Sequence, residues 1–132
     1  MIIQIYTDGG SLNNPGQSAY AYIIYIDNRI EQAAERMGVS TNNIAEYTAV
    51  VSALEKIKSI KPPKTDSIIL NSDSKLLVNQ LNGLYKVKNS QIRNMVIKIR
   101  ILEQEVKIPI SYRYIPREKN TLADALVKSV LK

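Results

Sequence analysis

The sequence predicts an α/β fold in which helices flank a mixed sheet, within one domain that covers residues 1–132. The first observation is the order of strand, long helix, strand, which forms a crossover unit and makes its two strands parallel. The second is a pair of strand-like segments joined by a tight turn, which makes them antiparallel. A chain of 132 residues is also the right size for one hydrophobic core.

The N-terminal third predicts three consecutive strands. Residues 2–6 carry apolar, mostly β-forming side chains on both faces, which indicates a buried central strand, and this strand ends at Asp8, where a loop rich in glycine and asparagine begins. Residues 18–26 form a second strand, and the turn at residues 27–28 predicts that residues 29–37 pair with it as an antiparallel edge strand. The Glu, Gln and Ala content of that last segment favours helix by propensity.

The rest of the chain alternates between helical spacing and short apolar runs. The expected elements are a helix that begins at residues 41–43 and ends before Pro62 and Pro63, a strand at 67–71, a short helix closed by Gly83, an amphipathic helix from 90 to 106, a strand at 110–115 and a last helix from Thr121. The strand at 67–71 is expected to run parallel to the first strand, because the long helix connects them.

Composition limits the chemistry. The chain has no cysteine and no histidine, so disulfides, thiolates and imidazole groups are excluded and carboxylates, Lys, Arg, Tyr and hydroxyls remain. No stretch has the apolar length of a membrane span, and the N-terminus lacks a secretion signal, so we expect a cytoplasmic protein without a membrane partner. The net charge of +6 favours an anionic partner such as nucleic acid, although a solvated basic surface would also explain it.

Four acids stand at special places: Asp8, Glu46, Asp73 and Asp124. Each has a structural explanation, as a turn former for Asp8 and as helix-capping residues for the other three. Together they suggest more, because Asp8 and Asp73 follow two parallel strands, and ligands collect at the carboxyl ends of such strands. Glu46 and Asp124 lie in the first turns of helices that can point to the same end. Four carboxylates without histidine indicate a site for Mg²⁺ or Mn²⁺.

Four segments that contain these acids resemble ribonuclease H type 1 in content and order: YTDGGSLNNPG at 6–16, STNNIAEYTAVVSAL at 40–54, NSDSKLLVNQLNG at 71–83 and PREKNTLADALV at 116–127. The resemblance implies a ribonuclease H-like fold with a five-stranded mixed sheet, in which the three N-terminal strands are antiparallel and the others are parallel to the first. It also implies an endonuclease that cuts the RNA strand of an RNA/DNA hybrid and leaves 5′-phosphate and 3′-hydroxyl ends.

The same resemblance assigns roles to the acids and their neighbours. It implies that Asp8 bridges two Mg²⁺ ions, with Mn²⁺ as an alternative, that Asp124 helps to hold the ion that activates water, and that Glu46 and Asp73 hold the other. Contacts to the nucleic acid are expected from the loop and the helix start, at Gly9, Gly10, Ser11, Asn14, Thr41, Asn42 and Asn43. The asparagines could instead serve only as turn and cap residues.

The sequence departs from the family pattern at two places. Many members carry a histidine on the loop before the last acid, and here Arg117 or Glu118 stands there. Some members carry a basic, tryptophan-bearing protrusion, for which residues 83–90 are too short. Binding of the DNA strand is therefore expected from Lys86 and Lys88, with weak and salt-dependent affinity.

Two other functions remain open at this stage. One is a module of the same fold that binds hybrid or double-stranded RNA without cutting it, and the other is a structural domain whose acids are caps. Double-stranded RNA is also a possible second partner of the enzyme, and the sequence indicates no obligate protein partner.

Overall fold

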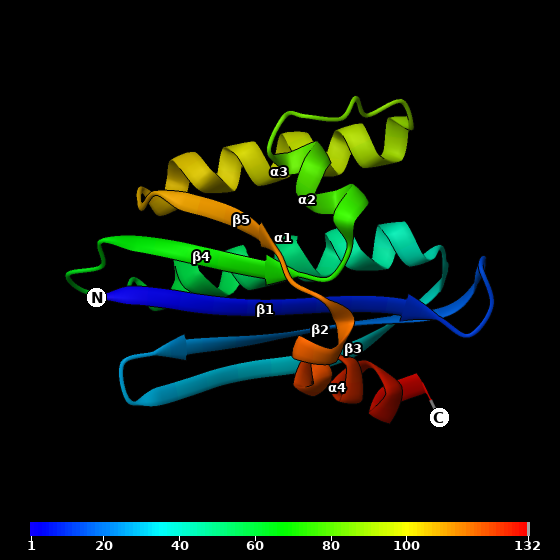
Figure 1. Ribbon diagram of the computed structural model, residues 1–132, viewed down its shortest axis with the longest axis horizontal. Helices are drawn as coiled ribbons and strands as arrows, with labels where there is room; N and C mark the ends of the chain where they lie inside the picture. The colour runs from blue at the N-terminus through cyan, green and yellow to red at the C-terminus, as the bar shows by residue number, and fades with distance from the viewer. Residues whose placement is uncertain (132) are drawn as a thin grey trace.

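The computed structural model describes residues 1–131. Five strands form one sheet in the order β3-β2-β1-β4-β5, and four α-helices lie against it (Figure 1). The elements in chain order are β1 (Ile2–Ser11), β2 (Gly16–Ile26), β3 (Arg29–Ser40), α1 (Asn42–Ile60), β4 (Ser67–Ser72), α2 (Lys75–Leu81), α3 (Ser90–Val106), β5 (Ile110–Tyr114), a 3₁₀ turn η1 (Arg117–Lys119) and α4 (Thr121–Leu131).

The sheet has the predicted mixed topology. β1 pairs antiparallel with β2 and parallel with β4, β2 pairs antiparallel with β3, and β4 pairs parallel with β5. β1 is central, as predicted, and Ile3 and Ile5 on one of its faces are fully buried. The expectation of a five-stranded sheet with three antiparallel N-terminal strands is therefore confirmed. The expectation that both faces are buried is wrong for the first half of the strand, because Ile2 on the other face is 55% exposed and Tyr6 is half-buried.

β3 shows how pairing overrides propensity. Its segment contains helix-favouring residues, yet it pairs with β2 along the whole length from Arg29 to Ser40, three residues beyond the predicted end. Asp27 adopts a left-handed conformation, with a φ of 53°, in the turn that joins the two strands. The backbone partners that β2 offers decide the conformation of this segment.

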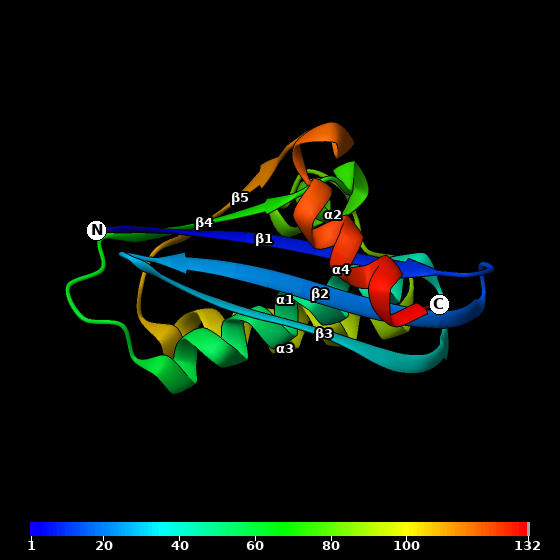
Figure 2. The same cartoon turned by 90° about the horizontal axis from the view of Figure 1, so that it is seen from below.

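The helices cover both faces of the sheet. α1 and α3 pack on one face over a core that includes Tyr47, Leu54, Leu70 and Ile99, all fully buried. α4 crosses the opposite face, over β1, β2 and β3 (Figure 2). Val127 of α4 packs there against the small side chains of Ala19 and Ala21 in β2. No helix within residues 1–131 is long and apolar enough to cross a membrane.

Candidate active site

Asp8 belongs to β1 and lies one residue beyond the point where β1 stops pairing with the parallel strand β4. The pairing of β1 with β4 ends at Thr7 and Ser72, while the pairing with β2 continues through Asp8 to Ser11. The prediction that the strand itself ends at Asp8 is therefore wrong. Since β1 extends three residues further, Asp8 is held by the sheet rather than by a turn, and only 6% of it is exposed.

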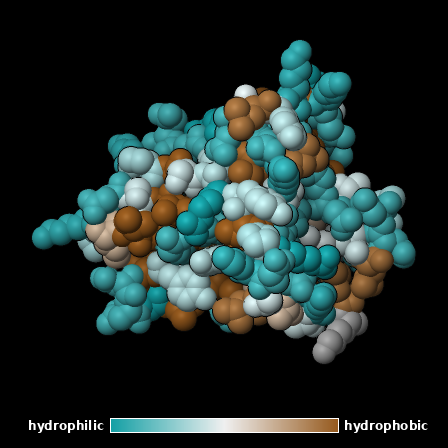
Figure 3. Space-filling model, viewed as in Figure 1, coloured by the Kyte–Doolittle hydropathy of each residue, from teal (hydrophilic) through white to brown (hydrophobic). Residues whose placement is uncertain are grey.

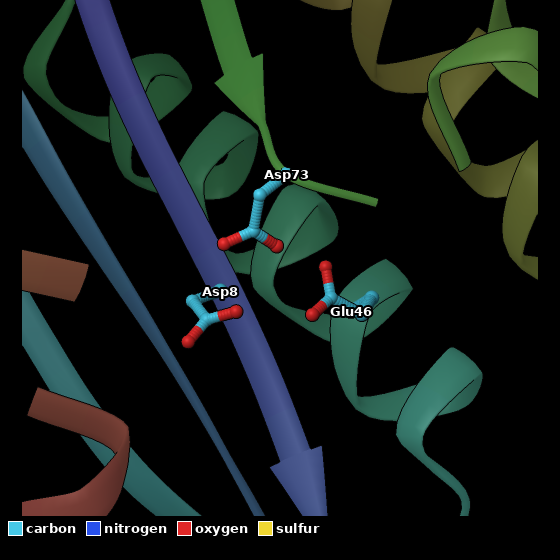
Figure 4. Close-up of side chains that lie close together, drawn as sticks. All are labelled: Asp8, Glu46 and Asp73. Atoms are coloured by element: carbon cyan, nitrogen blue, oxygen red, sulfur yellow. The ribbon is translucent and has the colours of Figure 1, made fainter. Parts of the chain in front are cut away.

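Two more acids converge on Asp8 from other elements. Asp73 follows the end of β4, and Glu46 belongs to α1. One carboxylate oxygen from each of Asp8, Glu46 and Asp73 lies within 4.8 Å of the others, and the three side chains approach one another in Figure 4. A strand, a helix and a loop thus build one acidic cluster.

The close packing of α1 on β1 brings Glu46 into place. A Cβ atom at Gly9 would lie 2.3 Å from the backbone carbon of Ala45, so only glycine permits this approach. The backbone N–H of Gly9 donates a hydrogen bond to Oε1 of Glu46 at 3.1 Å. Oε2 of Glu46 is buried and has no hydrogen-bond partner among residues 1–131.

Asp73 is held by a residue that the sequence did not single out. Nδ2 of Asn120 donates to Oδ2 of Asp73 at 3.2 Å and to the carbonyl oxygen of Thr7 at 2.9 Å. Asn120 is 2% exposed and immediately precedes α4. In the sequence it resembles an ordinary residue before a helix, and no local pattern shows its contact with Asp73.

The structure rules out the capping explanations of two acids. Ser74, not Asp73, caps α2, because its hydroxyl accepts from the N–H of Leu77. Thr41 caps α1 through the N–H of Ile44, while Glu46 bonds outside its own helix.

Asp124 lies apart from the other three acids. Its Oδ2 pairs with Nζ of Lys128 at 2.9 Å, and its Oδ1 lies 3.9 Å from a guanidinium nitrogen of Arg117. These contacts are ion pairs rather than the capping arrangement that spacing from Thr121 suggested. The four predicted acids nevertheless line one cleft of about 660 Å³.

Several other predicted residues border this cleft. Its lining includes Gly9, Gly10, Ser11, Asn42 and Arg117. Glu118 is exposed and does not line the cleft. Lys86 and Lys88 are exposed on the segment between α2 and α3, and hydrophilic side chains project from that end of the molecule in Figure 3.

The polar residues near the cleft connect the loop after β1 to the start of α1. Oδ1 of Asn14 accepts from the N–H of Asn42 at 3.0 Å, and Oδ1 of Asn42 accepts from the N–H of Ser11 at 2.8 Å. Each amide oxygen is used within the protein, so each NH₂ group remains as a donor at the surface. Asn43 is half-buried beside them.

The cluster raises the pKa of its own members. Burial is the main cause that raises the pKa of Asp8 to about 6, and the charges of Asp73 and Asp124 add to it. Burial and the neighbouring Asp8 also raise the pKa of Glu46 well above its usual value. Buried carboxylates that repel one another, with one oxygen lacking a partner, fit a hard divalent cation with oxygen ligands.

Comparison with known proteins identifies the family. A family model described as reverse transcriptase-like matches residues 6–130. The crystal structure of RNase H1 from the halophilic archaeon Halobacterium salinarum superposes with a TM-score of 0.89 at 31% identity, over 99% of this chain and 98% of that one. The chain belongs to the ribonuclease H family.

Other members of the ribonuclease H family match as well. LC11-RNase H1, solved in complex with an RNA/DNA hybrid, gives a TM-score of 0.90 at 35% identity, over 97% of this chain and 95% of that chain. The bifunctional protein Rv2228c of Mycobacterium tuberculosis is 31% identical over 134 residues, which is 99% of this chain and 36% of the relative. The chain thus spans about a third of the length of that relative. The predicted family resemblance is confirmed.

Proposed function

We propose that this protein is a metal-dependent endoribonuclease that hydrolyses the RNA strand of RNA/DNA hybrids and leaves 5′-phosphate and 3′-hydroxyl ends. The convergence of Asp8, Glu46 and Asp73 within 4.8 Å carries the proposal. The likeness to LC11-RNase H1, which was solved with an RNA/DNA hybrid, supports the substrate. Residues 1–132 form the proposed catalytic unit.

The proposed cofactor is a pair of Mg²⁺ ions, for which Mn²⁺ can substitute. Asp8, Glu46 and Asp73 would hold one ion, and Asp8 and Asp124 would hold the other. When bound, such ions make water more acidic and stabilise the negative charge that develops on a phosphodiester. The unpartnered Oε2 of Glu46 and the raised pKa of Asp8 support metal ligation by these groups.

The residues around the acids have supporting roles in this proposal. Asn120 holds the carboxylate of Asp73 in place through the 3.2 Å hydrogen bond. Arg117 and Lys128 pair with Asp124, so a ligand role of Asp124 would require these ion pairs to loosen. Arg117 lines the cleft and is proposed to contact a phosphate. Glu118 is exposed outside the cleft, so no role in catalysis is proposed for it.

Recognition of the hybrid is proposed to use two surfaces. Asn42 lines the cleft with the acids, and Asn14 bonds the backbone of Asn42. The amide and hydroxyl groups of Asn14, Thr41, Asn42 and Asn43 suit ribose 2′-hydroxyls, which donate and accept hydrogen bonds. Lys86 and Lys88 would contact phosphates of the DNA strand, in keeping with the net charge of +6.

Cleavage of a hybrid with labelled RNA tests this function. The wild-type protein should cut the RNA strand in Mg²⁺ but not in EDTA, and Asp8→Asn should bind the hybrid without cutting it. Double-stranded RNA in a parallel assay shows whether it is a second substrate. Wild-type protein that binds hybrid but does not cut it in either Mg²⁺ or Mn²⁺ would be a binding module instead.

A further inference from the structure

The basic connector, defined as residues 83–89 between α2 and α3, is exposed except for the half-buried Val87. Its first part is held by α2, because the N–H groups of Leu84 and Tyr85 donate to the carbonyl oxygen of Asn79. Further along, Nε2 of Gln80 donates to the carbonyl oxygen of Lys86 at 3.3 Å. Among residues 1–131, this is the one hydrogen bond that reaches the backbone of residues 86–88.

Gln80 is itself fixed by a fully buried tyrosine. The hydroxyl of Tyr47 donates to Oε1 of Gln80 at 2.7 Å, and Tyr47 is 0% exposed. Because an amide has an oxygen on one side and an NH₂ group on the other, this bond turns Nε2 toward Lys86.

The chain of contacts runs from the acidic cluster to the connector. Tyr47 follows Glu46 in α1, Gln80 lies at the end of α2, and Lys86 lies in the connector. A buried hydroxyl and a buried amide are costly unless they are bonded, so the packed interior favours this single arrangement over alternatives. Val87 packs against the core and the side chain of Asn89 caps α3, so the connector is anchored on both sides of Lys88. The bond from Gln80 is the contact that fixes the backbone at Lys86, and through it the position of the lysines.

We propose that Tyr47 and Gln80 are positioning residues that fix Lys86 and Lys88 at a set distance from the catalytic acids. The inference rests on the proposed function, in which these lysines contact the nucleic acid. The two buried side chains would fix the backbone of the exposed connector before the hybrid binds. Loss of the link lets the connector move, so the hybrid binds less well while the acids remain intact.

Tyr47→Phe removes only the hydroxyl and separates binding from catalysis. We expect KM for the hybrid to rise about three- to tenfold, the effect of one hydrogen bond, with kcat within about twofold of wild type. Tyr112→Phe is the matched control, because its hydroxyl bonds Glu103 of α3 at 2.5 Å and no residue of the connector, and Glu103 keeps its pair with Arg100. Its KM should equal that of wild type. Equal KM values for all three proteins would overturn the proposal.

A double-mutant cycle asks whether Tyr47 acts through the lysines. In the Lys86→Ala/Lys88→Ala background, Tyr47→Phe should raise KM no further, because the groups that it positions are gone. A further rise as large as that in the wild-type background would show that Tyr47 acts by another route and would overturn the proposal.

Limited proteolysis tests the hydrogen bonds from Tyr47 to Gln80 and from Gln80 to Lys86 without any nucleic acid. In the metal-free protein, trypsin should cut after Lys86 and Lys88 about two- to tenfold faster in Tyr47→Phe and in Gln80→Glu, relative to cuts elsewhere in the same protein. Gln80→Glu keeps the acceptor for Tyr47 and loses the donor to Lys86. Unchanged connector cleavage in both variants refutes the link, even where wild-type protein cuts no hybrid and the proposed function fails.

Discussion

The N–H of Gly9 donates to Oε1 of Glu46, and the lack of a side chain at Gly9 is what allows α1 to come this close. One residue of β1 therefore both admits the helix and orients its carboxylate. The second oxygen of Glu46 remains free for another partner.

Gly9→Ala should damage both stability and activity. Its Cβ would lie 2.3–2.5 Å from backbone atoms of α1, so the helix and strand must separate, at a cost of about 2–3 kcal/mol or more in the free energy of unfolding. Gly10→Ala is the control, because its Cβ would meet Val127 at an ordinary 3.6 Å. Urea unfolding should place Gly10→Ala within about 1 kcal/mol of wild type. Similar losses in the two variants would contradict the packing explanation.

Asp8→Asn should make the metal-free protein more stable while it abolishes cleavage. The increase in the pKa of Asp8 from 3.8 to about 6 corresponds to at most about 3 kcal/mol at neutral pH, and the neutral amide avoids this cost. We expect a gain of about 1–3 kcal/mol in urea unfolding at pH 7.5 in EDTA. A clear loss of stability would argue against a shared acidic site.

The metal-free protein should also lose stability as pH rises through the raised pKa of Asp8. The folded state holds the proton of Asp8 up to about pH 6, whereas the unfolded state releases it near pH 3.8, so this stabilisation is complete below pH 3.8 and is lost as pH rises through 6. Unfolding at pH 4 to 8 should show that the stability advantage of Asp8→Asn over wild type is small at pH 4 and grows as pH rises through 6. A difference that is constant with pH would contradict it.

Asn120→Ala should weaken the function of Asp73 without removing an acid. Because the amide orients Asp73 and joins it to β1, its loss should raise the Mg²⁺ concentration for half-maximal cleavage or lower kcat by about 10–100-fold. Asn82→Ala, which loses an amide bond to the carbonyl of Tyr112, is the control. If both variants keep the wild-type Mg²⁺ dependence and kcat, Asn120 has no part in positioning Asp73.

Lys86→Ala combined with Lys88→Ala should raise KM more than it lowers kcat. The pair should also reduce the dependence of KM on salt, since fewer counterions are released on binding. Lys56→Ala with Lys58→Ala removes the same charge from the far end of α1, where these lysines pair with Glu31 and Glu105. If both double variants have the same KM, a general effect of charge would explain the result.

The sequence predicts the strands and the position of two of the acids, because these features depend on local patterns and on the crossover rule. Periodicity and the turn at residues 27–28 place the strands, and the crossover rule brings Asp8 and Asp73 to one edge of the sheet. β3 was ambiguous because its propensity favours helix, and only the partner strand decides its conformation.

Hydrogen bonds and ion pairs between side chains far apart in the sequence could not be predicted from it. The bonds from Asn120 to Asp73 and from Tyr47 to Gln80 depend on how finished elements pack, and no spacing in the chain encodes them. The ion pairs of Asp124 likewise depend on the rotamers of Arg117 and Lys128.

The hydrogen bond from Asn120 to the carbonyl of Thr7 joins residues 113 positions apart in the sequence. During synthesis, β1 and α1 leave the ribosome long before Asn120 and α4. A nascent chain can therefore display Asp8 and Glu46 while nothing yet holds Asp73 or supplies Asp124. We therefore expect the growing polypeptide to be catalytically inactive until this late segment emerges and folds.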